Sequence, residues 1–199
     1  MLKEDVSEAV IARLTVFADL LTRWNSRINL VAPSDLDQLW DRHIADCVQL
    51  FGLIARHEAV TDLGSGAGFP GLIMAICGCD GVTLVEADGR KCSFLREAAR
   101  ASGVHVTIVN SRIEDARLPA ADVVTARALA PLPRLLDWAQ PLLTGGGRCL
   151  FLKGRKAEEE LTAVRSRWHM MVARTQSRTD PDGVILSLSQ IRRVAPMNC

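Results

Sequence analysis

The sequence lacks an excess of charge of either sign. Its 24 Lys and Arg residues are almost balanced by 23 Asp and Glu residues, which leaves a formal net charge of +1. A chain with this balance has no overall positive field that would attract nucleic acid. Any contact with RNA therefore has to come from a local group of basic side chains.

Long apolar stretches are also missing. The first five residues, Met-Leu-Lys-Glu-Asp, are acidic and are not followed by the apolar core of a signal peptide. The longest apolar run near the centre of the chain covers only residues 72–77, and a bilayer span needs about 20 residues. We therefore expect a soluble, cytoplasmic protein that has no membrane partner.

Cysteines are few and scattered, and they show no metal-binding pattern. Cys77 and Cys79 are the only close pair, and no second pair of cysteines or histidines accompanies them. A zinc site needs four convergent ligands. We expect reduced thiols in the core and no metal.

The patterning that is present divides the chain into two parts. Over residues 5–56 apolar residues recur every three or four positions, which predicts amphipathic helices; Ser34 suits the N-cap of the second one. Short β-rich segments then alternate with helical ones. We expect an N-terminal helical extension over 1–56 and a second domain over 57–199.

The alternation in the second part predicts a parallel sheet with helices on both faces. The expected strands cover residues 59–63, 81–86, 104–110, 121–127 and 147–153. The expected helices cover residues 70–77, 90–102, 131–143 and 156–168. Two further strands, 170–178 and 184–193, are joined by too short a segment for a parallel crossover, which predicts an antiparallel C-terminal hairpin.

A glycine-rich loop follows the first expected strand, in the stretch DLGSGAGFPG, and it can be read in two frames. Gly64, Gly66 and Gly68 form G-x-G-x-G, which is typical of a nucleoside-sulfonium site. Gly66, Gly68 and Gly71 form G-x-G-x-x-G, which is typical of a dinucleotide site. The first frame starts directly where the strand ends, as such loops do, whereas the second starts two residues late. The position of the loop favours S-adenosylmethionine (SAM), with close backbone approach and positive φ angles at some glycines.

Two further features bear on the ligand. Glu86 ends the second expected strand, where a carboxylate accepts hydrogen bonds from ribose hydroxyls; NAD sites use the same device, so Glu86 alone does not discriminate. The length of the chain does discriminate between SAM and NAD. A dehydrogenase needs a substrate domain after its dinucleotide domain, and here only the hairpin remains. Five parallel strands closed by an antiparallel hairpin predict the seven-stranded, mostly parallel, Rossmann-like α/β fold of SAM methyltransferases.

Seven segments in order make the sequence resemble the bacterial RsmG family, also called GidB, over about residues 15–190. The segments are WNSRINLV, DRHIADC, DLGSGAGFPG, VEADGRKCSFLR, SRIED, TARALAPL and FLKG. The resemblance implies a SAM-dependent methyltransferase that modifies guanine N7 in small-subunit rRNA. It further implies that the partner is 16S rRNA or the 30S subunit and that the target is guanosine 527 in the decoding-region loop. We expect a monomer.

The resemblance also implies particular cofactor contacts. Carried over residue by residue, it implies SAM contacts at Gly64, Phe69, Ile113, Glu114 and Arg127. Gly66, Gly68 and Glu86 join this set because of the loop argument above. Ile113 and Glu114 follow the third strand, where an apolar side chain and an acceptor suit the adenine face and its amino group.

The residues after the fourth expected strand suit a lone-pair acceptor. Arg127-Ala-Leu-Ala-Pro131 lacks the acid and carbonyl pattern that handles an exocyclic amine, and residues 120–144 contain no cysteine nucleophile for a pyrimidine carbon. Guanine N7 has an in-plane lone pair and no proton to lose. Orientation and proximity, which supply on the order of 7–11 kcal/mol, then suffice. We expect no general base, with Arg127 as a positioning group.

Basic residues near the strand ends are candidates for RNA contacts. Arg42, His43, Lys153 and Arg155 are expected around the same mouth as Arg127, and Arg23 and Arg27 would extend the patch. The alternative to an RNA contact is a hydrogen-bonded core position for His43 and a solvated surface position for the arginines. Two other functions stay open from the residues alone: an NAD(P)-dependent reductase, and a non-catalytic SAM-binding module that docks on ribosomes.

Overall fold

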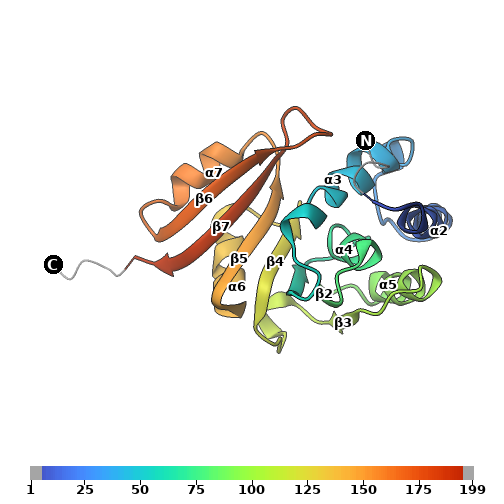
Figure 1. Cartoon of the computed structure of the whole chain (residues 1–199), viewed down its shortest axis with the longest axis horizontal. Coiled ribbons are helices and arrows are strands. Elements are labelled where there is room, and N and C mark those ends of the chain that lie inside the picture. The colour runs from blue at the N-terminus through green and yellow to red at the C-terminus, as the bar shows by residue number, and fades with distance from the viewer. Residues whose placement is uncertain (1–5, 195–199) are drawn as a thin grey trace.

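Short runs of β-branched and aliphatic residues form one seven-stranded sheet in the computed structural model, which describes residues 6–194 (Figure 1). The strands lie in the order β3-β2-β1-β4-β5-β7-β6. The neighbours β3-β2-β1-β4-β5 are parallel, whereas β7 pairs antiparallel with both β5 and β6. The strands are β1 (Ala59–Leu63), β2 (Gly81–Glu86), β3 (Thr107–Asn110), β4 (Ala121–Arg127), β5 (Leu143–Lys153), β6 (Trp168–Gln176) and β7 (Val184–Arg193). The predicted sheet and hairpin are confirmed.

Alternating side chains of the strands build a core on each face of the sheet. On one face, α2 (Glu8–Asn25), α3 (Ala45–Val48), α4 (Gly71–Cys77) and α5 (Gly89–Ala101) cover residues such as Val60 and Leu84. On the other face, α6 (Leu132–Ala139) and α7 (Ala157–Val164) cover residues such as Leu63 and Val85. Adjacent residues of a strand thus serve opposite cores, as the period of two requires.

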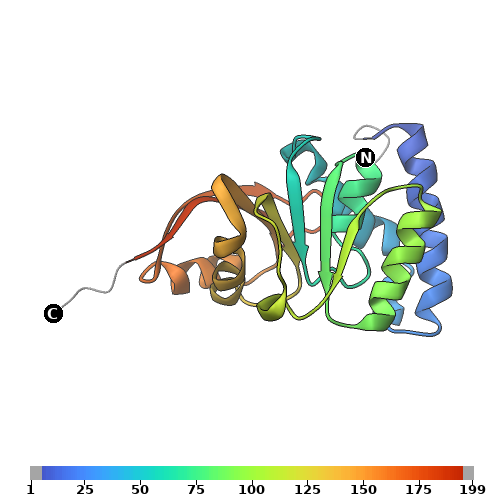
Figure 2. The same cartoon turned by 90° about the horizontal axis from the view of Figure 1, so that it is seen from below.

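The N-terminal helix α2 packs along α5, and the two run side by side in Figure 2. Phe94 of α5 lies between Phe17 and Trp24 of α2, with ring centroids 6.2 and 5.8 Å apart. Residues on both sides of the predicted boundary at 56/57 belong to one core cluster. The division into an extension and a methyltransferase domain stays a prediction.

The second N-terminal helix departs from the expectation. Instead of one α-helix starting at an N-cap Ser34, the chain forms a 3-10 turn (Pro33–Asp35), a π-helix (Leu39–Ile44), the short α3 and a second 3-10 turn (Phe51–Leu53). Ser34 lies inside the first turn and caps nothing. The π-helix is rare and is often found at functional sites; here its residues contact the end of β4.

Several element boundaries also differ from the predicted ones. The helix expected to end at residue 143 ends at Ala139, because Pro141 has no N–H to continue it, and a 3-10 turn (Gln140–Leu142) leads directly into a longer β5. The helix expected to reach Trp168 ends at Val164, and Trp168 starts β6. Strand β3 starts at Thr107, three residues later than predicted.

The cysteines of the described residues are free and buried, as expected: Cys47, Cys77, Cys79, Cys92 and Cys149. Burial raises the pKa of Cys79 to about 11, which keeps its thiol protonated. Cys199 lies outside the described residues. Within residues 6–194, the structure has no helix that is both long and apolar enough to cross a membrane.

Candidate functional site

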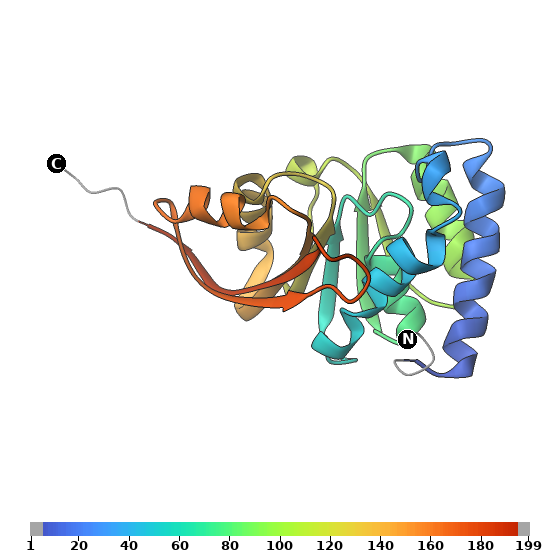
Figure 3. The ribbon, with the colours of Figure 1, turned by 90° about the horizontal axis from the view of Figure 1, so that it is seen from above.

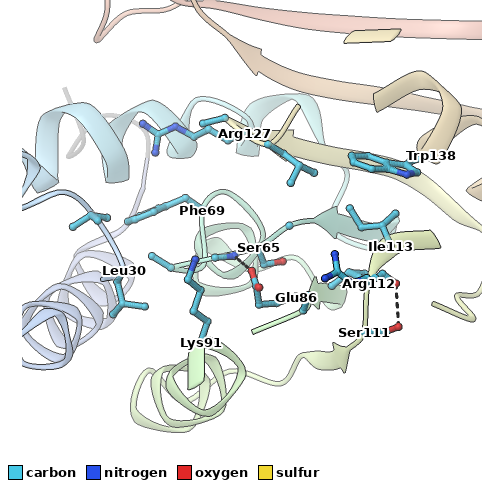
Figure 4. Close-up of a pocket in the computed structure, with 18 of the residues that line it drawn as sticks. Leu30, Ser65, Phe69, Glu86, Lys91, Ser111, Arg112, Ile113, Arg127 and Trp138 are labelled. Atoms are coloured by element: carbon cyan, nitrogen blue, oxygen red, sulfur yellow. Dashed lines mark hydrogen bonds between the residues drawn. The ribbon is translucent and has the colours of Figure 1, made fainter. Parts of the chain in front are cut away.

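The carboxyl ends of the parallel strands meet at one edge of the sheet, where a cavity of about 630 Å³ opens. The chain leaves the sheet in opposite directions from the neighbours β1 and β4, and such a switch point is where open α/β sheets bind ligands. Figure 4 shows Leu30 and Phe69 on one side of this cavity, Ile113 and Trp138 on the other, and Glu86 between them. We call it the first cavity.

The glycine loop forms the floor of the first cavity. Gly64, Gly66 and Gly68 have φ angles of 64°, 53° and 93°, which confirms the expected positive values. The amide of Ser65 donates to the carbonyl of Val85 at 3.0 Å, and this bond ties the loop to β2. A Cβ atom at Gly66 would meet only the Gly64 carbonyl, at 3.7 Å, so a side chain there would extend into open space.

The remaining glycines of the stretch serve packing. A Cβ at Gly68 would lie 3.0 Å from Leu72 Cβ, and Gly68 does not border the first cavity. A Cβ at Gly71 would lie 2.5 Å from Asp62 Cβ and 2.5 Å from Leu84 Cδ2. Gly71 therefore lets α4 pack closely on the sheet, which accounts for the last glycine of the dinucleotide-like frame without a dinucleotide.

Glu86 links the loop to the cavity. Its Oε2 accepts from the Gly66 amide at 2.9 Å (Figure 4). Its Oε1 accepts from the Asp88 amide at 2.8 Å. Each carboxylate oxygen has two lone-pair directions, so each keeps capacity for another donor. Glu86 borders the first cavity, and this arrangement fits a ligand that presents two neighbouring hydroxyls, as a ribose does.

The far side of the first cavity is apolar with a charged rim. Ile113 and Trp138 line it, and the Arg134 guanidinium lies over the Trp138 ring at 4.7 Å. Glu114 also lines the cavity, but its Oε1 accepts from Arg134 Nη2 at 2.6 Å. The carboxylate expected to hold an adenine amino group is therefore already paired on one oxygen.

Sequence reasoning missed the near wall, which the N-terminal segment supplies through Leu30, Val31 and Asp35. Asn25 at the end of α2 holds this wall, because its Oδ1 accepts from the amides of Leu30 at 2.9 Å and Val31 at 3.0 Å. The signal was present in the sequence, because Asn25 is the second residue of the segment WNSRINLV. Lys91, Ser111 and Arg112 also line the cavity and were not predicted.

Arg127 ends β4 and reaches the N-terminal segment. Its Nη1 lies 2.7 Å from His43 Nδ1, its Nη2 donates to the Arg42 carbonyl at 2.8 Å, and its Nε lies 3.4 Å from Asp46 Oδ2. The guanidinium carbon lies 5.7 Å from the centre of the Phe69 ring. Arg127 is thus oriented by three residues from the π-helix and α3, and its side chain is only 19% exposed.

His43 lies between Phe69 and Arg127 as a neutral acceptor. Its ring stacks on Phe69 with centroids 5.2 Å apart, and its Nε2 lies 3.4 Å from Asp35 Oδ2. Burial and, after it, the charge of Arg127 hold the pKa of His43 below the usual 6.5. A neutral ring with its proton on Nε2 leaves Nδ1 free to accept from Arg127 Nη1.

A second cavity, of about 360 Å³, lies on the other side of Arg127. Arg127 and Ala128 border both cavities, and Ala128 has a φ of 49°, an uncommon value for a residue with a side chain. Lys153 and Arg155 line the second cavity. Arg42 borders neither of these two cavities; its carbonyl holds Arg127. Arg23 and Arg27 border neither one.

The basic residues predicted around the mouth of the cavity differ in the exposure of their side chains. Lys153 is 11% exposed, and its Nζ lies 2.7 Å from Glu160 Oε2. Arg155 is 84% exposed and pairs with Asp182 at 2.6 Å. Contact with RNA phosphates stays a prediction for both.

Comparison with known families and proteins gives a consistent result. The model of the GidB family, described as rRNA small subunit methyltransferase G, matches residues 10–181. A ribosomal RNA small subunit methyltransferase G of Gluconobacter oxydans is 56% identical and covers 95% of this chain and 98% of its own length. A protein of the same name from Paramagnetospirillum magneticum is 54% identical, covering 96% of this chain and 94% of its own.

Solved structures share the fold at low sequence identity. The ribosomal protein L11 methylase of Lactobacillus delbrueckii has a TM-score of 0.59 and 15% identity, over 75% of this chain and 76% of its own. The M. jannaschii TYW2 structure in complex with AdoMet also has a TM-score of 0.59 and 15% identity, over 85% of this chain and 80% of its own.

Proposed function

Because this chain belongs to the GidB family of rRNA small subunit methyltransferase G proteins, we propose that it transfers a methyl group from SAM to N7 of guanosine 527 in 16S rRNA. It is a SAM-dependent rRNA methyltransferase. One observation carries the assignment of the site: Glu86 and the glycine loop that it accepts from border the same cavity at the switch point between β1 and β4.

The residues of the first cavity suit the parts of SAM. Glu86 has the acceptor capacity for the ribose hydroxyls, and the open side of Gly66 allows close approach of the ligand to the backbone. Ile113 and Trp138 offer apolar surface for the adenine ring. We propose that Gly64, Phe69, Glu114 and Arg127, which border the same cavity, complete the site, and that Gly68 supports it by packing.

The chemistry requires orientation more than proton transfer. Bound SAM supplies an electrophilic methyl group, and guanine N7 supplies the lone pair, so that the sulfur leaves with the electrons of the broken C–S bond. No proton is lost from N7, and the chain needs no general base. The described residues act by holding two reactants in line, which is worth on the order of 7–11 kcal/mol. We propose that Arg127, whose side chain borders both cavities, orients both reactants.

We propose that the substrate is 16S rRNA, free or within the 30S subunit, and that the enzyme works where ribosomal subunits assemble, in the cytoplasm. A monomer is proposed as well. The large apolar side chains that are more than a third exposed in residues 6–194 are Val16, Leu53, Met171 and Val194. They come from four different segments, which supports a protein without an obligate partner surface.

The two other functions separate in simple measurements. A reductase would bind NADH in calorimetry and would not bind SAM; the packing role of Gly71 removes the main argument for it. A non-catalytic module would bind SAM and transfer no methyl group to any RNA. We expect SAM binding and no NADH binding.

The test in cells uses the product itself. N7-methylguanosine is cationic, and borohydride reduction makes its glycosidic bond labile, so that aniline cuts the RNA there. We expect one such cut at the target in wild-type 16S rRNA, its loss when this protein is deleted, and its return with the wild-type chain. A cut that persists in the deletion strain would overturn the assignment.

A further inference from the structure

An enzyme that methylates N7 must still recognise guanine, because adenine also has an N7 lone pair. The two purines differ at the next two positions of the ring. Guanine presents an acceptor at O6 and donors at N1 and the 2-amino group, whereas adenine presents a donor at N6 and an acceptor at N1. A guanine-selective site therefore needs a donor and an acceptor side by side. This inference rests on the proposed function and names the residues that make the choice.

The second cavity is the place where such groups occur beside the first. It shares Arg127 and Ala128 with the first cavity, and its volume of about 360 Å³ is ample for a purine base. Its walls come from the ends of β4 and β5, from α3, and from the turn between β6 and β7. Figure 3 shows this turn lying against the short N-terminal helices.

The two carboxylate oxygens of Asp46 in α3 have different partners: one contacts the turn between β6 and β7, and the other contacts Arg127. Its Oδ1 accepts from Ser177 Oγ at 3.0 Å, from Thr179 Oγ1 at 3.1 Å and from Gln49 Nε2 at 3.2 Å. Its Oδ2 lies 3.4 Å from Arg127 Nε. One oxygen is therefore saturated by the turn, whereas the other keeps lone-pair capacity beside Arg127. The side chain is 13% exposed and borders the second cavity.

Lys153 supplies the donor in the same cavity. Its ammonium group has three N–H bonds. Two are accounted for by Glu160 Oε2 at 2.7 Å and the Ala130 carbonyl at 3.1 Å. The third is available to a ligand. Glu160 also offsets the lysine charge, so that a base that becomes cationic is not repelled by an unpaired ammonium group.

We propose that the second cavity receives the guanine base and that Asp46 is the residue that selects it. Asp46 Oδ2 accepts from N1–H and the 2-amino group, and Lys153 donates to O6. Adenine would place an acceptor against the carboxylate and a donor against the ammonium group. Methylation of N7 makes the ring cationic and N1–H more acidic, so the hydrogen bond to Asp46 strengthens as the methyl group is transferred. Such an interaction raises kcat as well as selectivity.

The test compares two substrates with one enzyme pair. Unmodified 30S subunits carrying either G or A at the target are incubated with labelled SAM, and the methylated nucleosides are separated and counted. We expect wild-type enzyme to methylate G and to discriminate strongly against A. In Asp46→Asn the amide offers a donor to adenine N1, so the ratio of kcat/KM for G to that for A should fall about tenfold or more.

Thr179→Val is the matched control, because it removes a donor from the saturated Oδ1 of Asp46, keeps the β-branched shape and leaves Oδ2 unchanged. Its G-to-A ratio should equal that of the wild type. If Asp46→Asn lowers both rates by the same factor, Asp46 only supports the structure and the proposal is wrong. If the wild type methylates neither substrate at N7, the proposed function itself fails, which is a different result.

A second measurement needs no variant. In 30S subunits reconstituted with semisynthetic 16S rRNA, 1-methylguanosine at the target blocks the hydrogen bond to Asp46 and leaves N7 intact. We expect its N7 methylation by wild-type enzyme to be at least about a hundredfold slower than that of guanosine. Equal rates would overturn the proposal even if Asp46→Asn failed to fold.

Discussion

The floor and the near wall of the first cavity are built in different ways. The floor is the glycine loop, which is held by positive φ angles at Gly64 and Gly66 and by hydrogen bonds that its backbone amides donate to β2 and Glu86. The near wall, residues 30–43, is held by side chains of other residues, from Asn25 to Leu30 and from Arg127 to His43. The backbone-built floor is pre-formed by local sequence, whereas the side-chain-built wall depends on a contact between residues 84 positions apart.

This difference predicts unequal responses to substitution. A change in the glycine loop should act on ligand binding directly, because the backbone itself faces the cavity. A change in the near wall should act through its position, with smaller effects that depend on protonation.

The largest effect is expected for Gly66→Val. The residue has a φ of 53°, which a β-branched side chain resists, and its Cβ would point into open space at the floor of the cavity. SAM affinity by calorimetry should fall at least about a hundredfold, while circular dichroism shows a folded protein. Gly103→Val is the matched control, with a φ of 65° and nothing within 4 Å, at the end of α5. Equal losses in both variants would contradict a ligand-facing Gly66.

Glu86→Gln should have the next largest effect. The amide keeps one acceptor for the loop but loses the charge that favours ribose hydroxyls, so SAM binding should weaken by about 1.5–3 kcal/mol. A sulfonium analogue without ribose hydroxyls should lose much less. The same loss for both ligands would show that Glu86 only supports the loop.

Asn25→Ala tests the side-chain-built wall. It removes the acceptor for the amides of Leu30 and Val31, which should lower the free energy of unfolding by about 1–2 kcal/mol and weaken SAM binding several-fold. Urea unfolding and calorimetry give the two values. Asn29→Ala is the control within the same loop, since Asn29 is exposed. If the wall does not need Asn25, the two variants should have the same free energy of unfolding and the same SAM affinity.

The smallest effect concerns pH. The pKa of His43 lies below its usual 6.5 in the folded protein, so the unfolded chain takes up a proton first as the solution is acidified. His43 therefore makes its full contribution to the free energy of unfolding above about pH 6.5. This contribution decreases as the pH falls toward the lowered pKa. His43→Gln keeps a neutral side-chain acceptor for Arg127. Its stability relative to the wild type should rise between pH 7 and pH 5, and a constant difference would show that His43 does not titrate as described.

The sequence predicted the floor of the first cavity well, because everything that builds it is local. Strand β1, the loop and Glu86 follow each other within 28 residues, and their spacing alone identified the floor of the cavity. The parallel sheet followed from the alternation of strands and helices, and the antiparallel hairpin followed from the short segment between the last two strands.

The side-chain-built wall was not predictable in the same way. Apolar spacing over residues 36–51 indicated one regular helix, but contacts of Arg42, His43 and Asp46 with Arg127 prevail, and the segment becomes a π-helix and short turns. No periodicity encodes a partner 84 residues away. Asp46 was overlooked for this reason, although it lies within the DRHIADC segment that pointed to the family.

The most direct test of the account is the identity of the nucleoside that the purified protein makes. The wild-type chain is incubated with SAM and 30S subunits from cells that lack it, and the 16S rRNA is digested and analysed by mass spectrometry. We predict one new 7-methylguanosine per 16S rRNA, located at the target nucleotide. A methyl group on an exocyclic amine or a pyrimidine carbon, or no transfer by a protein that binds SAM, would contradict the account.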